Sequence, residues 1–460
     1  MQKNQLTQSL WLMLVIIVVL LATSLLPSGN REFFSFKKVN LLSDIQRKEI
    51  IHDSTLAIVA QDSLPVSDTV ITEPTPKPIV EAPSNESPCP NGKTCLEDFS
   101  KNKDVMKVFF QALKKVNRNP VRIAFFGDSF IEGDVLCGSF RDTLQNLYGG
   151  RGVGFVPITS EVTQFRTTIQ HSFSNWLTYS MVGKQSPNAP LGISGHSFVP
   201  LEQNELEYKP GRKQLTNKFE IIRLFYINRK ASSLALTLND TILSNTDLIQ
   251  SETLQQEVIE GKYFKSIKLQ FQNPDSLLVY GVSFENGPGV YVDNFSMRGN
   301  SGMGLSSISE ELLQQFNQYQ DYKLILLQYG LNLVTENDSM NYRAYQTRMI
   351  KVVNRLKGIF PKASIVLIGI SDRGGNVDGE IKTLPAIPRM RDAQWEIARK
   401  TNIAFWDLYS AMGGENSIVK FTSAMPPLAA KDYTHLNFRG GRKLAKKLAD
   451  ALLYEENRYD

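Results

Sequence analysis

Residues 121–129 read Val-Arg-Ile-Ala-Phe-Phe-Gly-Asp-Ser, a short apolar run that ends in glycine, aspartate and serine. Such a run is typical of a strand that is buried in a parallel sheet. Open α/β sheets form their ligand crevice at the carboxyl ends of the strands, so this pattern places the hydroxyl of Ser129 in the crevice. Gly127 allows the sharp turn that follows the strand. The simpler alternative is a helix cap, because Asp128 and Ser129 are both residue types that cap helices.

Further apolar runs follow along the chain, and helical patterns separate them. The runs cover residues 290–295, 324–329, 365–370 and 403–406, and the helical patterns include residues 342–360 and 390–400. Strands that alternate with helices indicate a parallel sheet with helices on both faces. The sequence therefore predicts an α/β domain.

Between Gly149 and Gly289 the pattern changes to short alternating runs without helical periodicity. The runs are separated by turn signals, and they cover residues 219–226, 234–238, 267–271 and 277–284. We predict an inserted all-β sandwich domain over residues 151–289. The α/β domain is then split into residues 104–150 and 290–460, as is physically reasonable for an insertion into a surface loop.

A second reactive pair lies near the C-terminus, where Asp432 precedes His435 by three residues. A serine hydroxyl is a poor nucleophile unless an imidazole removes its proton, and a carboxylate must orient that imidazole. We predict that His435 is the base for Ser129 and that Asp432 orients it. The alternative is an aspartate cap beside a surface histidine. It is weakened because the chain has four histidines, of which the other three lie in the N-terminal region or in the insertion.

Two more strand ends offer donors for an oxyanion hole. Gly299 follows the run at residues 290–295, and Asn332 follows the run at residues 324–329. Their backbone and side-chain amides, with the N–H of Ser129, are donor types that stabilise a tetrahedral intermediate. Taken singly, each position is also compatible with an ordinary turn at a strand end.

The order Ser129, Gly299, Asn332 and Asp432-x-x-His435 resembles the four sequence blocks of the SGNH/GDSL hydrolase superfamily. The resemblance covers roughly residues 104–150 and 290–455. It implies a flavodoxin-like three-layer fold, ester hydrolysis through an acyl-enzyme, and no metal or other cofactor. One departure is Leu333, since the third block usually carries an aspartate there. The G-x-S-x-G turn of the α/β-hydrolases is absent at the nucleophile.

A closer resemblance is to Gram-negative peptidoglycan O-acetylesterases, which carry a carbohydrate-module-like β-domain after the first block. Residues 138–144 and 148–155 are similar to their passage into that domain. This likeness implies an O-acetylated glycan as the substrate. We expect the insertion to select the polymer through aromatic side chains, with the candidates Trp176, Tyr179, Phe225, Tyr226 and Tyr263.

The N-terminus carries a membrane-anchor signal. Residues 10–26 are apolar and uncharged, near the lower limit of about 17–25 residues for a spanning helix. A cleaved signal peptide is the alternative, although its apolar stretch is usually about 7–15 residues long. We expect residues 1–9 to be a cytoplasmic tail, residues 10–26 a single-pass transmembrane helix, and residues 27–103 a membrane-proximal segment with a disordered Pro-rich tether. The catalytic domain would then be periplasmic, bound to the cell membrane.

Composition excludes several other functions. The 51 Lys and Arg against 46 Asp and Glu leave a net charge of +5, far from the concentrated basic field that nucleic-acid binding needs. The three cysteines lack the paired spacing of a zinc site. Cys89 and Cys95 flank a turn-forming Pro-Asn-Gly and would close a small disulfide loop in an oxidising compartment, with free thiols as the alternative. Cys137 is expected to be a buried thiol.

Three functions remain from these patterns. The first is an extracytoplasmic esterase that removes O-acetyl groups from a cell-wall or surface polysaccharide. The second is a polysaccharide O-acetyltransferase that uses the same residues and is supplied by a membrane-bound O-acyltransferase. The third is a glycan-binding protein without catalytic activity, and it is disfavoured because all four blocks keep reactive residue types.

Overall fold

The computed structural model describes residues 89–90, 92–186, 188–212, 215–261, 263–336 and 341–459, together with Trp11 and residues 30–31 and 34–35. The chain divides into two units, Met1–Lys77 and Pro78–Asp460. In the first unit, β1 (Asn30–Arg31) pairs antiparallel with β2 (Phe34–Ser35). Within the described ranges, no helix is both long enough and apolar enough to cross a membrane. The predicted transmembrane helix, residues 10–26, lies outside the described residues apart from Trp11, as does most of the predicted tether.

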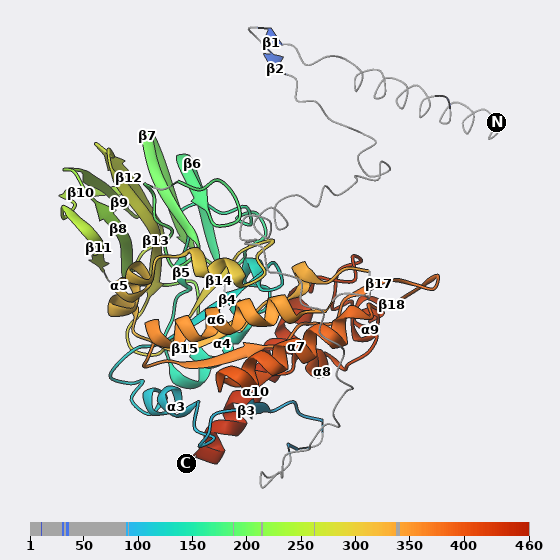
Figure 1. Cartoon of the computed structure of the whole chain (residues 1–460). Helices are drawn as coiled ribbons and strands as arrows, with labels where there is room; N and C mark the ends of the chain where they lie inside the picture. Colours follow the sequence, from blue (N-terminus) through green and yellow to red (C-terminus); the bar gives the residue numbers. More distant parts are fainter. Residues whose placement is uncertain are drawn as a thin grey trace, which may run out of the picture. The chain divides into compact units, whose positions relative to one another are not determined.

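The second unit contains a mixed α/β part built on a six-stranded sheet (Figure 1). Its strand order is β14 (Val290–Ser296), β4 (Val121–Gly127), β15 (Tyr322–Gln328), β16 (Ser364–Ile368), β19 (Ala404–Trp406) and β3 (Leu96–Asp98). All pairings among the first five strands are parallel. Counted along the chain, these five strands lie in the order 2-1-3-4-5, which is the flavodoxin-like order. The predicted α/β fold with a parallel sheet is confirmed.

Helices cover both faces of this sheet. On one face, α10 (Phe438–Tyr459) packs against α3 (Lys107–Leu113) and α4 (Cys137–Tyr148). On the other, α6 (Arg343–Ile359) packs against α5 (Glu310–Gln320) and α7 (Ala386–Thr401). The chain adds β14 on one side of β4 and the later strands on the other side, and this explains the division, because right-handed crossovers that run in opposite directions along a parallel sheet place their helices on opposite faces.

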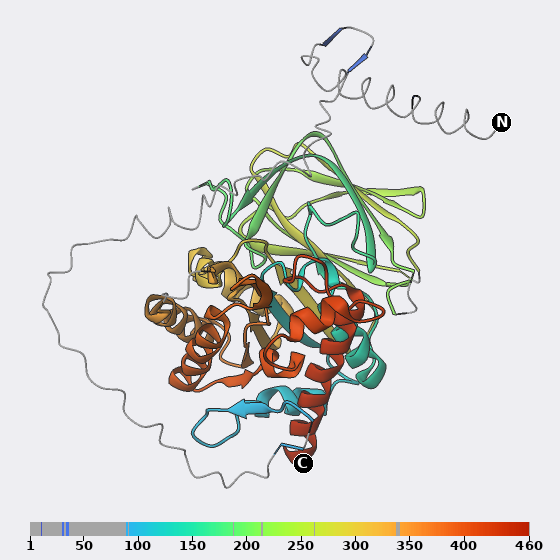
Figure 2. The same cartoon turned by 90° about the vertical axis from the view of Figure 1, so that its right-hand side faces the viewer.

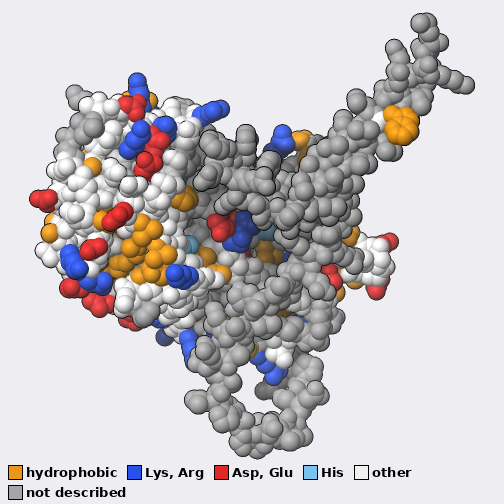
Figure 3. Space-filling model, turned by 90° about the horizontal axis from the view of Figure 1, so that it is seen from above, with side chains coloured by type: hydrophobic (Ala, Val, Ile, Leu, Met, Phe, Trp, Pro, Cys, Tyr) orange, Lys and Arg blue, Asp and Glu red, His pale blue; other side chains and the backbone are white. Residues whose placement is uncertain are grey.

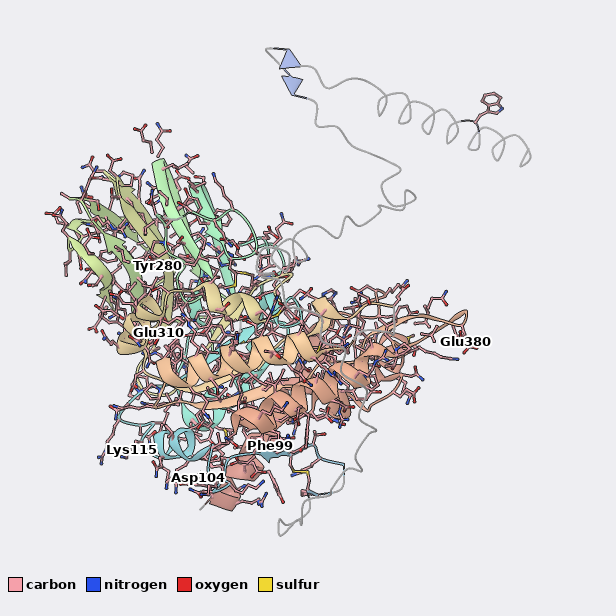
Figure 4. All side chains as sticks on the ribbon, viewed as in Figure 1. Phe99, Asp104, Lys115, Tyr280, Glu310 and Glu380 are labelled. Atoms are coloured by element: carbon pink, nitrogen blue, oxygen red, sulfur yellow. A yellow bond between two sulfur atoms is a disulfide. The ribbon has the colours of Figure 1, made fainter. Side chains whose placement is uncertain are left out.

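The sheet begins earlier in the chain than the boundary expected at Asp104. Strand β3 pairs antiparallel with β19, and the Trp406 Nε1 donates to the carbonyl of Thr94 at 3.0 Å. Phe99, labelled in Figure 4, packs edge-on against Trp395 with ring centroids 5.0 Å apart. Residues 94–99, which the sequence analysis assigned to the tether, are therefore part of the folded domain.

The structure also settles the state of the three cysteines. Cys89 and Cys95 form a disulfide directly before β3. Cys137, at the start of α4, is free and buried, and burial raises the pKa of its thiol to about 12. The expected buried thiol is confirmed, and of the two alternatives left open for Cys89 and Cys95 the bonded one is found.

The insertion forms one nine-stranded antiparallel sheet. Its strands curve around a common interior (Figure 2). They are β5 (Gly154–Val156), β6 (Ile169–Ser180), β7 (His196–Pro210), β8 (Ile221–Asn228), β9 (Ser233–Leu238), β10 (Thr241–Asp247), β11 (Ser251–Glu260), β12 (Ile267–Gln272) and β13 (Leu277–Glu285). The long strand β7 pairs with β13 near its start and with β12 near its end. Because β7 pairs with both β12 and β13, the strands that a sandwich would divide between two sheets belong to one continuous sheet.

Strands β8 and β13 are apolar on both faces. Ile222, Leu224 and Tyr226 point into the interior of the insertion, whereas Phe225 packs against the α/β core, 5.6 Å from the ring of Phe316 on α5. The expectation that Phe225 and Tyr226 contact sugar is wrong, since both side chains are fully buried. An aromatic residue on a strand can be exposed to solvent or covered by another part of the protein. The sequence pattern does not show that the α/β core covers Phe225 and the interior of the insertion covers Tyr226.

The same double burial occurs on β13. Tyr280, labelled in Figure 4 close to Glu310 of α5, contacts Phe316 with ring centroids 5.6 Å apart. Its neighbours Leu277 and Val279 point to the opposite side, into the interior of the insertion. The insertion and the α/β part therefore share an apolar interface and are not two modules on a flexible linker.

The remaining elements lie around the carboxyl edge of the parallel sheet. A hairpin, whose Glu380 is labelled in Figure 4, follows β16, and two short helices follow β19. They are β17 (Gly374–Val377), β18 (Glu380–Thr383), α8 (Leu408–Met412) and α9 (Ser417–Ser423), with the 3-10 turns η1 (Glu132–Asp134), η2 (Met303–Ser307) and η3 (Leu331–Leu333).

Two truncated chains test where the fold begins. A chain that starts at Pro78 keeps the whole second unit, and we expect it to have the same free energy of unfolding as the full chain. A chain that starts at Asp104 loses the disulfide and β3, and we expect it to be about 2–5 kcal/mol less stable in urea unfolding. The Cys89→Ser variant separates the disulfide from the strand pairing. Equal stability of the two truncated chains would show that β3 contributes nothing.

Candidate active site

The nucleophile turn consists of residues 127–131 and leaves the carboxyl end of β4. Every residue of β4 is buried, and the strand is paired on both edges, so its end has a fixed position. The Asp128 N–H donates to the carbonyl of Gln328 at the end of β15. The Asp128 side chain then accepts from the Phe130 N–H at 2.9 Å and closes the turn. Ser129 is thereby held where the strand ends, as the sequence predicts.

The structure brings Ser129, His435 and Asp432 together in one chain of hydrogen bonds. The distance from the Ser129 Oγ to the His435 Nε2 is 3.0 Å, and that from the His435 Nδ1 to the Asp432 Oδ2 is 2.7 Å. The second oxygen of Asp432 accepts from the backbone N–H groups of Thr434 and His435, each at 3.0 Å. This is the arrangement in which an imidazole can take a proton from a serine hydroxyl.

The electrostatics of Asp432 suit an orienting carboxylate. Partial burial would raise its pKa, but the hydrogen bonds from the backbone and ring of His435 and from Thr434 outweigh burial and hold the pKa below its ordinary value. The carboxylate is therefore ionised at neutral pH, and it keeps the Nδ1 side of the ring protonated. The side chains of Asp432 and His435 are 49% and 41% exposed, so a large substrate can reach them.

The loop that carries Asp432 and His435 is tied to the rest of the site through a segment that the sequence analysis missed. The Gly374 N–H donates to the carbonyl of Tyr433 at 2.8 Å. The guanidinium of the preceding Arg373 donates to the carbonyls of Leu331 and Val334, at 3.2 and 3.1 Å, on either side of Asn332. Burial lowers the pKa of Arg373, against the raising effect of Glu336 and Asp432. No motif marks Arg373, because its role depends on two loops that are distant in the sequence.

The three predicted oxyanion donors lie at the ends of neighbouring strands. Gly299 adopts a φ of +78°, a left-handed conformation that favours glycine. In the described part of the chain, no residue accepts a hydrogen bond from the backbone N–H of Gly299 or of Ser129. The Asn332 amide donates to the carbonyl of Asn300 at 2.9 Å and contacts the Asp128 Oδ2 at 3.4 Å. The longer contact is weak, so a developing oxyanion can replace it.

The departure at Leu333 is compensated locally. The aspartate that usually follows the asparagine is absent, but Asn300 and Asp128 hold the Asn332 amide instead. Asn300 is itself fixed, because its Oδ1 accepts from the Gly302 N–H at 2.9 Å. The orientation of Asn332 is thus set by residues of the two neighbouring strand ends.

Asp128 is a second carboxyl group in the site, and its environment is the opposite of that of Asp432. It is fully buried, and burial raises its pKa to about 7, although the Phe130 N–H lowers it. Glu132 adds to the increase. The sequence shows the residue but not its burial, which follows from the packing of three strand ends.

Comparisons with solved structures show a shared fold. A peptidoglycan O-acetylesterase structure superposes with a TM-score of 0.63 and 20% sequence identity, over 79% of this chain and 99% of that one. A family two carbohydrate esterase from Cellvibrio japonicus aligns over 63% of this chain and 100% of that one, with 9% identity and a TM-score of 0.26. No protein-family model and no curated protein matches the sequence. The resemblance to SGNH hydrolases that the four blocks indicate is confirmed at the level of the fold by the first of these structures.

The raised pKa of Asp128 predicts a pH effect on stability. Its pKa is about 7 in the folded chain against 3.8 as the ordinary value, so the folded state binds the extra proton between these values. The stabilisation is complete below about pH 4 and is lost as the pH rises through 7. We test this by urea unfolding of wild type and Asp128→Asn from pH 4 to 8. The free energy of unfolding of the wild type should fall by a few kcal/mol relative to that of Asp128→Asn, at about 1.4 kcal/mol for each pH unit between about pH 4 and 7.

Asp432→Asn is the control for this measurement. The pKa of Asp432 is lowered, so its contribution is present above about pH 4 and is lost only at lower pH. Measured in a His435→Gln background, so that no ring charge acts on Asp432, the stability difference caused by Asp432→Asn should stay level from about pH 5 to 8. A level difference for Asp128→Asn as well would mean that the Asp128 carboxyl group is ionised throughout.

Proposed function

We propose that this chain, which has the fold of the SGNH hydrolases, is a serine esterase that removes O-acetyl groups from an extracytoplasmic polysaccharide. The observation that carries the proposal is the chain of hydrogen bonds from Ser129 through His435 to Asp432, at 3.0 and 2.7 Å. Two backbone N–H groups without an acceptor among the described residues lie at adjacent strand ends. A nucleophile, its base, its orienting carboxylate and oxyanion donors are the parts that acyl transfer requires.

The reaction follows from this geometry. The Ser129 Oγ attacks the carbonyl carbon of the ester while His435 Nε2 takes the hydroxyl proton. The N–H groups of Ser129 and Gly299 and the amide of Asn332 stabilise the oxyanion. When the intermediate collapses, the C–O bond to the sugar breaks and the sugar oxygen takes the proton from His435. Water then gives a proton to His435 and attacks the carbonyl carbon of the acetyl-serine. When this second intermediate collapses, the bond from the acyl carbon to the Ser129 Oγ breaks, the Oγ takes the proton back from His435, and acetic acid is released.

Three observations support an O-acetylated glycan outside the cytoplasm as the substrate. The structure with the TM-score of 0.63 is that of a peptidoglycan O-acetylesterase. The half-exposed Asp432 and His435 leave the catalytic residues open to a polymer. The Cys89–Cys95 disulfide is typical of proteins in oxidising compartments, in agreement with the predicted membrane anchor at residues 10–26. The anchor and a membrane-bound O-acyltransferase partner remain predictions from the sequence.

A serine-directed fluorophosphonate tests the proposal together with acetate release from O-acetylated peptidoglycan. We expect the probe to label Ser129 in the wild type and acetate to appear at a rate proportional to enzyme concentration. Ser129→Ala should lose labelling, and its turnover should fall at least about 1,000-fold, because the reactive hydroxyl is gone. Ser306→Ala, which removes an exposed hydroxyl bonded to the carbonyl of Met303, is the matched control and should keep full activity.

Two outcomes would change the assignment. Labelling of Ser129 without acetate release, but with transfer of acetyl to an added sugar, would identify an O-acetyltransferase. Absence of labelling at Ser129 in a folded chain would instead support the third function, a glycan-binding protein that has no catalytic activity.

If the insertion selects the polymer through aromatic side chains, substitutions at two of its tyrosines should have different effects on turnover of the polymer. Tyr179 lies at the end of β6, half-buried, with the Lys184 Nζ 5.8 Å from its ring centre. Residues 181–182, just after Tyr179, contact the oxyanion loop at Gly299 and Asn300, whereas the more exposed Tyr263 lies between β11 and β12. Hydrophobic side chains also gather on the face of the insertion seen in Figure 3. Phe173 of β6 and Leu201 of β7 are 37% and 45% exposed.

Tyr179→Ala should therefore lower kcat/KM on O-acetylated polysaccharide by roughly 5- to 20-fold and spare a small chromogenic acetate, because a remote contact only positions the polymer. Tyr263→Ala is the matched control and should change neither. Equal losses on both substrates for Tyr179→Ala would mean that this ring supports the catalytic centre itself.

A further inference from the structure

The insertion reaches the nucleophile turn through a buried cluster of charged groups around Asp134. The carboxylate of Asp134 accepts from both terminal nitrogens of Arg141 on α4, at 3.1 and 3.0 Å. It also accepts from Arg166 Nη2 at 3.0 Å and from the Thr168 hydroxyl at 2.5 Å. Arg166 and Thr168 belong to the insertion, directly before β6. They are the only side chains of the insertion that hydrogen-bond Asp134 in the described part of the chain.

This cluster is connected to the nucleophile within a few bonds. Asn294 on β14 donates to Asp134 Oδ1 at 2.9 Å and to the carbonyl of Ile131 at 3.0 Å. The Glu132 N–H donates to the carbonyl of Ser129 at 3.3 Å. Asn294 therefore links the carboxylate of Asp134 to Ile131, the last residue of the nucleophile turn.

The backbone directly after the nucleophile turn needs this support. Gly133 and Asp134 have φ values of +63° and +62°, and aspartate in a left-handed conformation is disfavoured unless its surroundings hold it there. The packing is close as well, because a Cβ placed on Gly138 of α4 would lie 3.1 Å from the Asp134 side chain and 3.3 Å from that of Thr168. The conformation beyond Ser129 is thus set by tertiary contacts.

The charges show which substitution is informative. Burial would raise the pKa of Asp134, but Arg141 and Arg166 outweigh it and hold the pKa well below its ordinary value. The cluster contains one carboxylate and two guanidinium groups, so loss of Asp134 would leave two buried cations without an anion. Loss of Arg166 instead leaves a balanced, bidentate pair between Asp134 and Arg141. A variant at Arg166 can therefore keep the fold while it removes the contribution of the insertion.

A second contact, independent of the first, joins the insertion to the oxyanion loop. A Cβ placed on Gly299 would lie 3.6 Å from the Val182 Cγ1. The sulfur of Met181 lies 3.4 Å from the Asn300 amide, next to Gly299. Residues 181–182 follow β6 directly, so the segment before β6 contacts the Asp134 cluster and the segment after it contacts the oxyanion loop.

We propose that the inserted β domain is part of the catalytic machinery, with Arg166 as a positioning residue for Ser129. This proposal rests on the proposed function. Arg166 acts on the reaction through Asp134 and the nucleophile turn and touches no reacting atom. It replaces the expectation that the insertion only selects the polymer and can be separated from the chemistry.

The test compares two partly buried arginines of the insertion in the full chain. Arg166→Met removes the cation at Asp134, where its side chain is 8% exposed. Arg223→Met is the matched control, because Arg223 bonds to buried Glu285 at 3.2 Å and is 22% exposed, away from the nucleophile turn. In Arg166→Met, Asp134 keeps its ion pair with Arg141. In Arg223→Met, Glu285 likewise keeps its ion pair with Arg122. Turnover of a small acetate ester, the rate of Ser129 labelling and Tm are measured for both.

We expect Arg166→Met to lower kcat and the labelling rate constant together by roughly 10- to 100-fold, with KM within about threefold, because misplacement of a reacting group acts on the chemical step. Arg223→Met should keep kcat within about threefold at a comparable loss of Tm. Arg166→Lys should recover part of the rate. If Arg166→Met does not fold, Thr168→Val removes a single bond to Asp134 and should lower the labelling rate constant by about 3- to 10-fold.

Two results would overturn the proposal. One is a kcat for folded Arg166→Met and Thr168→Val within about twofold of the wild type. The other is an equal loss of kcat in Arg223→Met, which would make the effect one of general stability. Failure of the proposed function gives a different result, since the wild type itself would then show neither labelling nor turnover.

Discussion

Strand β4 is paired in parallel with β14 on one edge and with β15 on the other, and the register of these pairs determines the site. Gly127 is aligned with Ser296 of β14 and with Gln328 of β15, so the three strands end at one level. Ser129, Gly299 and Asn332 each follow within a few residues of these ends. A shift of one strand by a single residue would separate the nucleophile from its oxyanion donors, because the spacing along a strand is about 3.3 Å per residue.

The insertion is joined to this framework by charge as well as by apolar packing. The Asp134 cluster connects it to the nucleophile turn, and Glu285 of β13 binds Arg122 of β4 and Arg223 of β8. Buried ion pairs are costly to desolvate, so they are better at fixing geometry than at adding stability. Together with the doubly buried strands β8 and β13, they place the insertion against the carboxyl and amino ends of β4 alike.

The site contains two carboxyl groups, those of Asp432 and Asp128, whose surroundings shift their pKa values in opposite directions. Asp432 lies in an exposed loop, where hydrogen bonds from His435 and Thr434 keep it ionised. Asp128 is buried among three strand ends, where the absence of water favours its neutral form. One carboxylate can thus support a charged imidazole, while the other takes part in the packing beneath Ser129 and Asn332.

The sequence by itself predicted the parallel α/β domain and a β insertion, both of which the structure contains. It also named Ser129, Asp432 and His435, which the structure brings together, and Gly299 and Asn332 as candidate oxyanion donors. These are local signals, since an apolar run followed by a reactive residue type is read within ten positions. Tertiary structure alone decided the roles of Arg166, Arg373 and Asp128, the inclusion of β3, and the burial of Phe225 and Tyr226. Each of these depends on contacts between segments far apart in the chain, and a residue's type carries no record of which distant surface will cover it.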